Sequence, residues 1–373
     1  MAANWDAIRA GFPSLERWTF LNTATFGQLP RRSAEAVARH FAQRDQTACS
    51  DFLSWFDDMD CLRAGVAKLI GATAADIAFV PNAGAALSLL IGGIEWRPGD
   101  RVVTLKDEFP NNSYAPAMLA RGAELVEAEW AEFCDAITPR TRLVAVSEVN
   151  YTSGFRPPLG EIARRAHEMG ALFYVDGTQS MGALRFDVEA AGADMFAAHA
   201  YKWLLSPNGA AFMYVRPSLR ERLAPSVIGW RSDAGWRNVD NLHHGAPEPS
   251  AAAEKYECGM LAFPSLYGMK ASVEMLLEIG PEAIERRVLG LAEYTRAALR
   301  GLGAQLPADE SPYFNSGITA ARLEGADASA LARELKNRCV QISARHGFLR
   351  ISTHFYNNEQ DVDRLVAELR RLL

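Results

Sequence analysis

Between about residues 77 and 217, short apolar runs typical of β-strands alternate with stretches of helical periodicity, and this alternation limits the possible folds more than any other feature of the chain. Helical patterns such as Asn112–Arg121 and Gly160–Met169 separate several of the runs. The strand candidates are Ile77–Pro81, Arg101–Lys106, Ala123–Ala128, Leu143–Val149, Leu172–Asp176, Met195–Ala198 and Ala210–Val215. Because apolar strands that alternate with helices form parallel sheets buried on both faces, the sequence predicts the α/β class with a mostly parallel, seven-stranded sheet.

The pattern changes after Gly268, where a second domain is expected. Long amphipathic helices are predicted there at about residues 268–279, 282–301 and 327–338, between short strands near 315–320 and 348–353. We therefore predict a large domain of residues 15–265 and a small α+β domain of residues 1–14 and 266–373. Segment 229–265 is rich in Gly, Pro, Trp and His without clear periodicity, and long irregular segments of compact enzymes are often functional.

Composition excludes several classes of protein. The chain has 373 residues, 49% of them hydrophobic, and a net charge of −6 without a basic block, so no nucleic-acid partner is expected. Five scattered cysteines show neither a CxxC pair nor a metal spacing, which predicts reduced thiols and no metal site. The N-terminus has no signal pattern, and the longest apolar stretch, about Ala83 to Ile94, is too short to span a bilayer. A soluble, cytoplasmic protein without a membrane partner is the expectation.

Two of the predicted strands end in residues that together indicate a cofactor. The run Leu172–Asp176 ends in an acid, and the next apolar run leads into His199-Ala200-Tyr201-Lys202-Trp203. Desolvation at the end of a buried strand disfavours a charged lysine, and a lysine with a lowered pKa can form a Schiff base with an aldehyde. Pyridoxal 5'-phosphate needs such a lysine and an acid for its pyridinium nitrogen. Lys202 and Asp176 are the predicted catalytic residues, and pyridoxal 5'-phosphate is the predicted cofactor.

A second pattern indicates a phosphate site. The turn Asn82-Ala83-Gly84 follows a predicted strand and opens a predicted helix, so its backbone N–H groups could approach an anion that the helix N-terminus attracts. A tight turn capped by Asn82 is the alternative, and for this string alone it is favoured. Beside Lys202, the phosphate site is preferred. Phe109, after the next strand, could stack on a flat cofactor ring, or fill the core.

Near the C-terminus, Arg350 lies in the strand-like run Leu349–Ser352. A guanidinium in that position can hold a carboxylate with two parallel hydrogen bonds. The alternative is a surface ion pair, which is the usual role of an arginine. Arg345 is the nearest competitor for the carboxylate.

Together these strings resemble the class V aminotransferase-like group of fold-type-I pyridoxal phosphate enzymes, which includes cysteine desulfurases, kynureninases and isopenicillin N epimerase-like proteins. The resemblance extends over nearly the whole chain, from Phe20–Ala24 to Arg350–Asn357. Its most specific strings are Asp176–Gln179, His199–Leu204 and Leu349–Asn357. It implies fold type I, a small-molecule amino acid substrate, and a homodimer with its sites at the subunit interface.

The resemblance also implies a role for each candidate residue. Lys202 would bind the aldehyde of the cofactor and Asp176 its ring nitrogen, while Gln179 would contact the ring hydroxyl and Phe109 would stack on the ring. Arg350 would hold the substrate α-carboxylate, with Arg345 and Asn22 as further substrate contacts. The residues expected around the phosphate are Asn82, Ala83, Gly84, His199 and Tyr201.

The chain departs from the desulfurases at several positions. Tyr201 precedes the lysine where desulfurases usually have His, and Gln341–Leu349 lacks the catalytic cysteine that they carry before the arginine. Gly84 and Met260 stand where relatives often offer the phosphate a threonine hydroxyl. Persulfide chemistry is therefore not expected, although a direct C–S lyase stays open.

We accordingly expect a pyridoxal-phosphate enzyme that acts at Cα of an amino acid, with a class V aminotransferase as the first choice. A C–S or kynureninase-like lyase, or an amino acid epimerase, is the alternative, because these residues do not specify the fate of the carbanion once it has formed. A catalytically idle binding or scaffold protein is the least favoured possibility, since Lys202, Asp176, Gln179 and Arg350 are all present.

Overall fold

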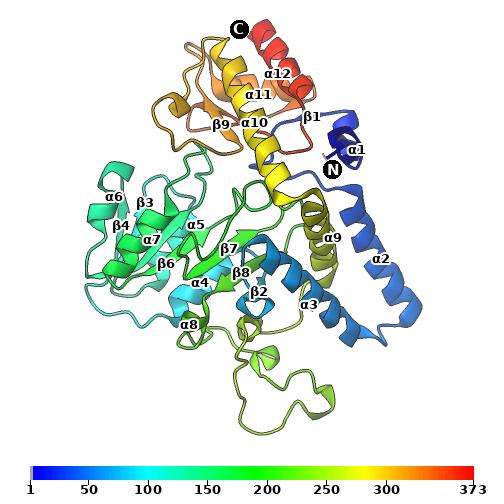
Figure 1. Ribbon diagram of the computed structural model, residues 1–373, viewed down its shortest axis with the longest axis vertical. Helices are drawn as coiled ribbons and strands as arrows, with labels where there is room; N and C mark the ends of the chain where they lie inside the picture. Colours follow the sequence, from blue (N-terminus) through cyan, green and yellow to red (C-terminus); the bar gives the residue numbers. More distant parts are fainter. Residues whose placement is uncertain (1–2) are drawn as a thin grey trace.

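A twisted seven-stranded sheet forms the centre of the large domain in the computed structural model, which describes residues 3–373 (Figure 1). Its strand order is β2-β8-β7-β6-β5-β3-β4. Strand β8 runs antiparallel to its neighbours β2 and β7, and the remaining pairings are parallel. The strands are β2 (Ile77–Val80), β3 (Arg101–Leu105), β4 (Glu124–Ala128), β5 (Thr141–Ser147), β6 (Leu172–Asp176), β7 (Met195–His199) and β8 (Ala211–Val215). The predicted α/β class and mostly parallel sheet are confirmed.

Both faces of this sheet are buried, as the apolar runs predict. On β6, Phe173 and Val175 pack into one hydrophobic cluster, whereas Tyr174 packs into another on the opposite face. Helices α3, α7 and α9 contribute to the first cluster, and α4 contributes to the second. The large-domain helices are α2 (Arg31–Thr47), α3 (Phe52–Leu69), α4 (Ala83–Gly93), α5 (Asn111–Leu119), α6 (Phe133–Ala136), α7 (Leu159–Glu168), α8 (Pro217–Arg220) and α9 (Phe263–Ile279).

The small domain lies at the end of the molecule where the C-terminal helix is found (Figure 1). Its main sheet is antiparallel, in the order β11-β12-β9, and a short parallel pair joins β1 to β10. Its own hydrophobic cluster includes Leu335, Ile351 and Leu365. The elements are β1 (Thr19–Phe20), α10 (Pro281–Arg300), β9 (Ile318–Ala321), α11 (Ala328–Asn337), β10 (Val340–Gln341), β11 (Ser343–Arg345), β12 (Phe348–Ser352) and α12 (Glu359–Leu372).

The packing differs from the predicted domain boundaries at two places. The prediction assigns residues 15–22 to the large domain, but β1 pairs with β10 and Asn22 bridges to Ser352 of the small domain. The predicted boundary at residue 265 falls inside α9, which packs along α2 and α3. Both differences have one cause, because such long-range pairings are not visible in local periodicity. The N-terminal helix α1 (Trp5–Arg9) does lie against the small domain, where Arg9 pairs with Asp361 at 2.8 Å.

The N-terminal segment also fixes the turn that carries Lys202. The N–H of Gly27 donates to the carbonyl of Tyr201 at 2.9 Å. A Cβ atom at Gly27 would lie only 1.8 Å from the carbonyl oxygen of Lys202, so this close approach requires glycine.

We expect Gly27→Ala to displace the Lys202 turn and to lower the free energy of unfolding by about 1–3 kcal/mol, because the backbone oxygen leaves no room for a methyl group. Urea unfolding of the purified protein measures this. Gly290→Ala in α10 is the matched control, since nothing lies within 4 Å of a Cβ added there. It should leave stability unchanged or slightly higher. Equal stability of the two variants would contradict the prediction.

Candidate active site

A small cavity lies at the carboxyl ends of the parallel strands, where the loops after β2, β3, β5, β6 and β7 meet. Its lining residues are Ala83, Phe109, Asn111, Ser147, Tyr151, Asp176, Thr178, Gln179, His199, Tyr201 and Lys202. A second cavity of about 310 Å³ shares Ser147 with it and extends to His346 and Phe348 of the small domain. The site therefore lies in the large domain and opens toward the small one.

Lys202 is buried in the turn after β7, with 6% of its surface exposed. Burial lowers the pKa of its amine to about 8; the charge of Asp176 opposes this shift, and the charges of Arg350 and Arg345 add to it. Its Nζ lies 5.4 Å from the centre of the Phe109 ring. A lysine with such a pKa has a much larger neutral fraction near neutral pH than an exposed one, so it is suited to nucleophilic attack.

Two contacts with other segments hold this turn besides Gly27. Trp203 donates its Nε1–H to Gln179 Oε1 at 3.0 Å, and its carbonyl accepts a hydrogen bond from His354 Nε2 at 2.9 Å. His354 Nδ1 accepts from the N–H of Phe355, so this buried histidine is neutral, and burial lowers its pKa to about 3. The turn is thereby fixed by both domains.

Asp176 is the last residue of β6, and the register pairs it with Ala197 of β7 and with Ser147 of β5. Burial raises the pKa of its carboxyl, while hydrogen bonds from Thr178 and the charge of Lys202 lower it. Its Oδ1 accepts the N–H of Thr178 at 2.8 Å. A buried acid in this environment is able to hold a cationic N–H group in the cavity.

Gln179, His199 and Tyr201 also line the cavity. The Gln179 amide donates to the carbonyl of Ala24 at 3.1 Å besides accepting from Trp203, so one of its two N–H groups is left for a ligand. His199 packs edge-on against Tyr201, with ring centres 4.3 Å apart. Burial and the charge of Lys202 lower the pKa of His199 to about 4, so this ring is neutral near pH 7.

Two observations show that the residues present fit pyridoxal phosphate. His199 Nε2 is buried and has no hydrogen-bond partner among residues 3–373, as expected of a group that meets a ligand. The N-terminus of α4, an 11-residue helix, opens at the cavity with Ala83, where its first N–H groups have no intrahelical partner. Asn82 is the N-cap of α4, with Oδ1 accepting from the Ala85 N–H at 2.8 Å. The predicted cap and the predicted phosphate turn therefore coexist, with Asn82 supporting the turn and lying outside the cavity lining.

Arg350 reaches this site from β12 and is almost fully buried. Its Nη1 donates to the carbonyl of Tyr151 at 2.6 Å, and its Nη2 donates to Thr25 Oγ1 at 2.5 Å. Thr25 Oγ1 in turn donates to Asn22 Oδ1 at 2.9 Å. Asn22 thus acts on the site through Thr25 and Arg350. Arg345 lies on the facing strand β11, and neither arginine lines the lysine cavity itself.

Sequence reasoning missed Glu108, which precedes Phe109. Its buried carboxylate accepts hydrogen bonds from the Ser147 N–H at 2.6 Å, from Ser147 Oγ at 2.5 Å and from Asn112 Nδ2 at 3.1 Å. Burial raises its pKa to about 7, and the charge of Asp176 adds to the rise. A carboxyl three residues after a buried strand was the available signal. Ser147, Tyr151 and Thr178 were also missed, because only the pairing of β5 with β6 and the turns after them bring these residues to the cavity.

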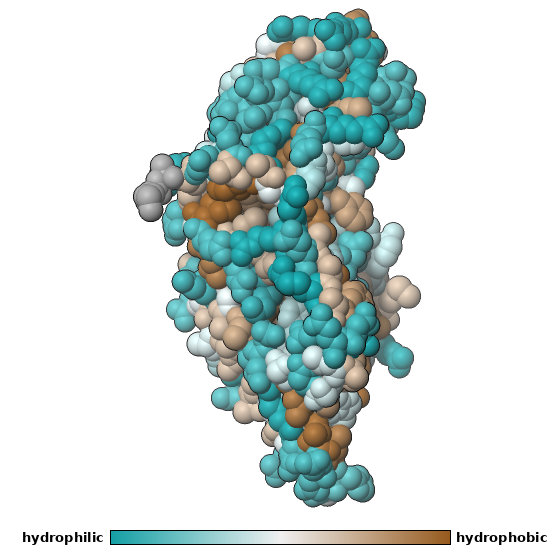
Figure 2. Space-filling view, turned by 90° about the vertical axis from the view of Figure 1, so that its right-hand side faces the viewer, coloured by the Kyte–Doolittle hydropathy of each residue, from teal (hydrophilic) through white to brown (hydrophobic). Residues whose placement is uncertain are grey.

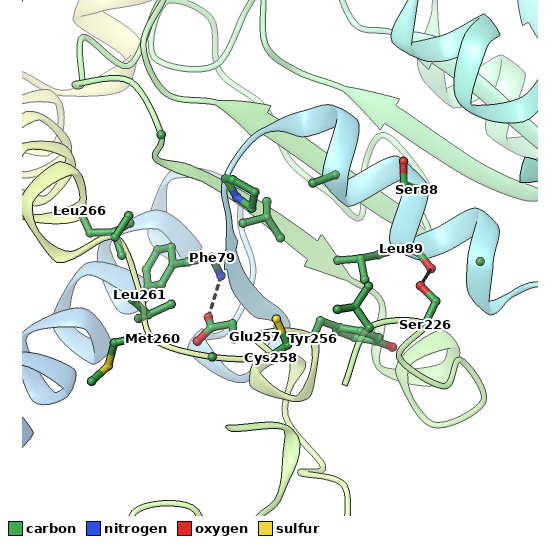
Figure 3. Close-up of a pocket in the computed structure, with 18 of the residues that line it drawn as sticks. Phe79, Ser88, Leu89, Ser226, Tyr256, Glu257, Cys258, Met260, Leu261 and Leu266 are labelled. Carbon is green, nitrogen blue, oxygen red and sulfur yellow. Dashed lines mark hydrogen bonds between the residues drawn. The ribbon is translucent and has the colours of Figure 1, made fainter. Parts of the chain in front are cut away.

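A larger and mostly apolar cavity of about 640 Å³ lies beside α4 rather than at Lys202. Figure 3 shows it between Leu89 of α4, Phe79 of β2 and the segment from Tyr256 to Leu261. Its single charged residue, Glu257, is already hydrogen bonded to the N–H of Phe79 at 2.7 Å and to Arg63 at 2.6 Å. Neither Lys202 nor Asp176 lines this cavity, so size alone does not locate the candidate active site.

Two further findings concern metals and membranes. Within residues 3–373, no group of three or more His, Cys, Asp or Glu side chains could hold a metal ion. In the same part of the chain, every helix is too short or too polar to cross a membrane.

The raised pKa of Glu108 predicts a pH dependence of the cofactor-free protein. Between about pH 4.5 and pH 7 the carboxyl is ionised in the unfolded chain but protonated in the folded one, so stability falls as pH rises through this window. We expect Glu108→Gln to weaken this fall by on the order of 2 kcal/mol, because it keeps the neutral form throughout. Urea unfolding at both ends of this pH range measures the change in the free energy of unfolding for each protein. Glu148 is another buried acid with a raised pKa. It is present in both proteins, so its contribution to the pH dependence cancels in the comparison. An identical pH dependence of variant and wild type would contradict the prediction.

Several known proteins are similar to this chain over their full length. It is 28% identical to the isopenicillin N epimerase of Streptomyces clavuligerus, with 98% of each chain covered. It is 26% identical to a probable cysteine desulfurase of Methanothermobacter thermautotrophicus, again with 98% of each covered. Among solved structures, the apo cysteine desulfurase of Thermococcus onnurineus superimposes with a TM-score of 0.89 at 21% identity, covering 100% of this chain and 99% of that one.

The family described as aminotransferase class-V matches residues 40–365. Pyridoxal phosphate is the cofactor of this family, and a solved variant of the cystine lyase C-DES, with a TM-score of 0.87 at 21% identity and covering 97% of this chain and 98% of that one, has glycine covalently linked to it. The resemblance, the fold and the cofactor predicted from the sequence are therefore confirmed. The chain belongs to the class-V aminotransferase family.

Proposed function

We propose that this protein uses pyridoxal phosphate to act at Cα of an amino acid substrate, most naturally as an aminotransferase. The observation that carries the proposal is the buried Lys202, whose pKa is lowered to about 8, beside the buried acid Asp176. Buried charge of this kind is costly in a structural role, and perturbed pKa values in a cavity are typical of catalytic groups. Arg350, which donates to the carbonyl of the cavity residue Tyr151, supplies a site for the α-carboxylate.

Each residue of the site has a role in this proposal. When bound, pyridoxal phosphate supplies an aldehyde for the amine and an electron sink for the Cα carbanion. Asp176 holds the ring nitrogen in its protonated form, and Phe109 covers the ring. The N-terminus of α4 and His199 hold the phosphate, while Gln179 offers its remaining N–H to the ring hydroxyl.

Lys202 is the proposed general base and acid. Once the substrate amine has displaced it, its amine takes the proton from Cα. Lys202 would support transamination by passing that proton to the carbon that carried the aldehyde, whereas epimerisation would need a second acid to protonate Cα from the opposite face. Loss of a substituent from Cβ gives a lyase.

A C–S lyase or an epimerase is the second candidate, because relatives carry those names. One solved neighbour, with a TM-score of 0.85 at 21% identity, is the cystine C–S lyase C-DES with its product cysteine persulfide. In this chain β11 and β12 are joined by the short turn at His346 and Gly347, and no cysteine lies between Gln341 and Leu349. A persulfide on the enzyme is therefore not part of the proposal, whereas direct C–S cleavage of a substrate is compatible with the site.

A homodimer and a cytoplasmic location complete the proposal. The groove of Figure 3 is lined by Leu119, Val227 and Met260, whose exposed fractions are 44%, 52% and 61%. Figure 2 shows a largely hydrophilic small domain and hydrophobic residues near the lower end of the molecule. A second copy would cover this cavity and bring Met260 toward its partner's phosphate site. Sedimentation of the native protein would check the dimer.

All five cysteines are free thiols, which supports a reducing compartment.

The proposal is tested by reducing the cofactor-loaded protein with borohydride and mapping its peptides. The pyridoxyl group should be found on Lys202, and labelling of another lysine would refute the assignment. A screen of amino acids scored for keto acid, sulfide and inverted enantiomer then distinguishes the three reactions. Keto acid formation supports the aminotransferase, and sulfide or enantiomer alone supports the second candidate.

Replacing Asp176 with Asn should preserve the fold and the lysine linkage but reduce turnover by about 100-fold or more, because the amide cannot hold the ring nitrogen protonated. Steady-state kinetics and the absorbance of the loaded variant measure both effects. Asp187→Asn is a suitable control, since that acid lies outside the cavity and caps the turn at Glu189 and Ala190. Near-normal turnover of Asp176→Asn would show that the ring nitrogen is not used.

A further inference from the structure

Two arginines of the small domain, Arg345 and Arg350, face the cleft from one hairpin. The register of β11 and β12 pairs Ser343 with Arg350 and Arg345 with Phe348. Directly paired residues of an antiparallel ladder share a face, as do residues two apart on one strand, so these four side chains lie on the same face. Arg350 shows which face this is, because it reaches across the cleft to the carbonyl of Tyr151.

Neither guanidinium is neutralised by the protein. Their hydrogen-bond partners among residues 3–373 are the carbonyls of Ala344 and Tyr151 and the hydroxyls of Ser343 and Thr25. Burial lowers the pKa of both Arg350 and Lys202, and the charge of Arg345 lowers both further, so the three cations act on one another. Such repulsion is relieved when anions bind between the cations.

Glu108 and Asp176, two of the buried acids near this site, have other partners. Glu108 accepts hydrogen bonds from Ser147 and Asn112, and Asp176 accepts from Thr178. Their positions at the ends of strands in the large domain leave the small-domain face of the cleft with uncompensated positive charge. An α-carboxylate at Arg350 would neutralise only one of the two arginines.

We propose that the substrate carries a second acidic group on its side chain, and that Arg345 binds this group while Arg350 holds the α-carboxylate. The substrate class is then the acidic amino acids, of the size of aspartate or glutamate. Arg345 and Arg350 are diagonal neighbours across the two paired strands, about 7–8 Å apart, and long arginine side chains that converge from such positions can meet both carboxylates of one small molecule. Tyr151 of the lysine cavity and His346 of the neighbouring cavity are hydrogen bonded to each other at 3.0 Å, so the two cavities adjoin at this hairpin. This inference rests on the proposed function at Lys202.

The test compares matched pairs of ligands on the cofactor-loaded protein. Aspartate and asparagine, and glutamate and glutamine, differ in the side-chain charge but hardly in size. Titration of the cofactor absorbance gives a dissociation constant for each. We expect at least one acid to bind about 10-fold or more tightly than its amide, as for one charge-assisted hydrogen bond. Arg345→Gln should bring the ratio of the amide's dissociation constant to the acid's close to one. Arg345→Lys should retain part of the preference for the acid.

Two controls separate charge recognition from other effects. Arg333→Gln removes an exposed arginine of α11 and should leave the ratio unchanged. Arg350→Lys should weaken the binding of acids and of amides to the same extent. Thermal melting of every variant shows whether it is folded, and the lysine-for-arginine change keeps the test open if Arg345→Gln does not fold.

The outcomes are distinguishable. Equal affinity for acids and amides in the wild type, or an acid preference that survives Arg345→Gln, overturns the assignment of Arg345 while leaving the chemistry at Lys202 in place. If Arg345→Gln weakens the binding of acids and amides equally, Arg345 is a second contact of the α-carboxylate. That outcome also overturns its assignment to the side-chain acid. If no amino acid changes the cofactor absorbance, the proposed function itself fails.

Discussion

The burial of a lysine at the carboxyl end of β7 is the constraint on which the rest of the site depends. Burial disfavours the ammonium form, so a lysine is retained there only if its surroundings compensate or use the neutral amine. Asp176 on the adjacent strand supplies one opposite charge, and the turn that carries Lys202 is fixed by Gly27, Gln179 and His354. A reactive amine is thereby held in one position by segments far apart in the chain.

The two domains contribute different chemistry to the cleft. The large domain provides Lys202, Asp176 and the N-terminus of α4, because the carboxyl ends of parallel strands meet at one edge of the sheet. The small domain provides cations on the face of a hairpin, because its antiparallel register places Arg345 and Arg350 on one side. Within residues 3–373, neither arginine has an acid among its hydrogen-bond partners. This excess of positive charge favours an anionic group of the substrate on the small-domain side.

The family alone does not decide the reaction, since similar chains bear the names of an epimerase and of desulfurases. Around the candidate site, a short turn joins β11 and β12 ahead of Arg350, and Tyr201 packs on His199. The candidate reactions differ in their products, so product analysis is the decisive measurement.

The sequence by itself determined the α/β class and the sheet strands to within two residues at almost every end, and it predicted the pair Lys202 and Asp176, which the structure brings to one cavity. It could do so because strand periodicity, a lysine in an apolar context and an acid at a strand end are local signals. Only the tertiary structure decided that β1 belongs to the small domain, that Glu108 binds Ser147, and that Asn22 acts through Thr25 on Arg350. These contacts join residues distant in sequence, and their geometry depends on strand register and turn conformation, which no local pattern specifies.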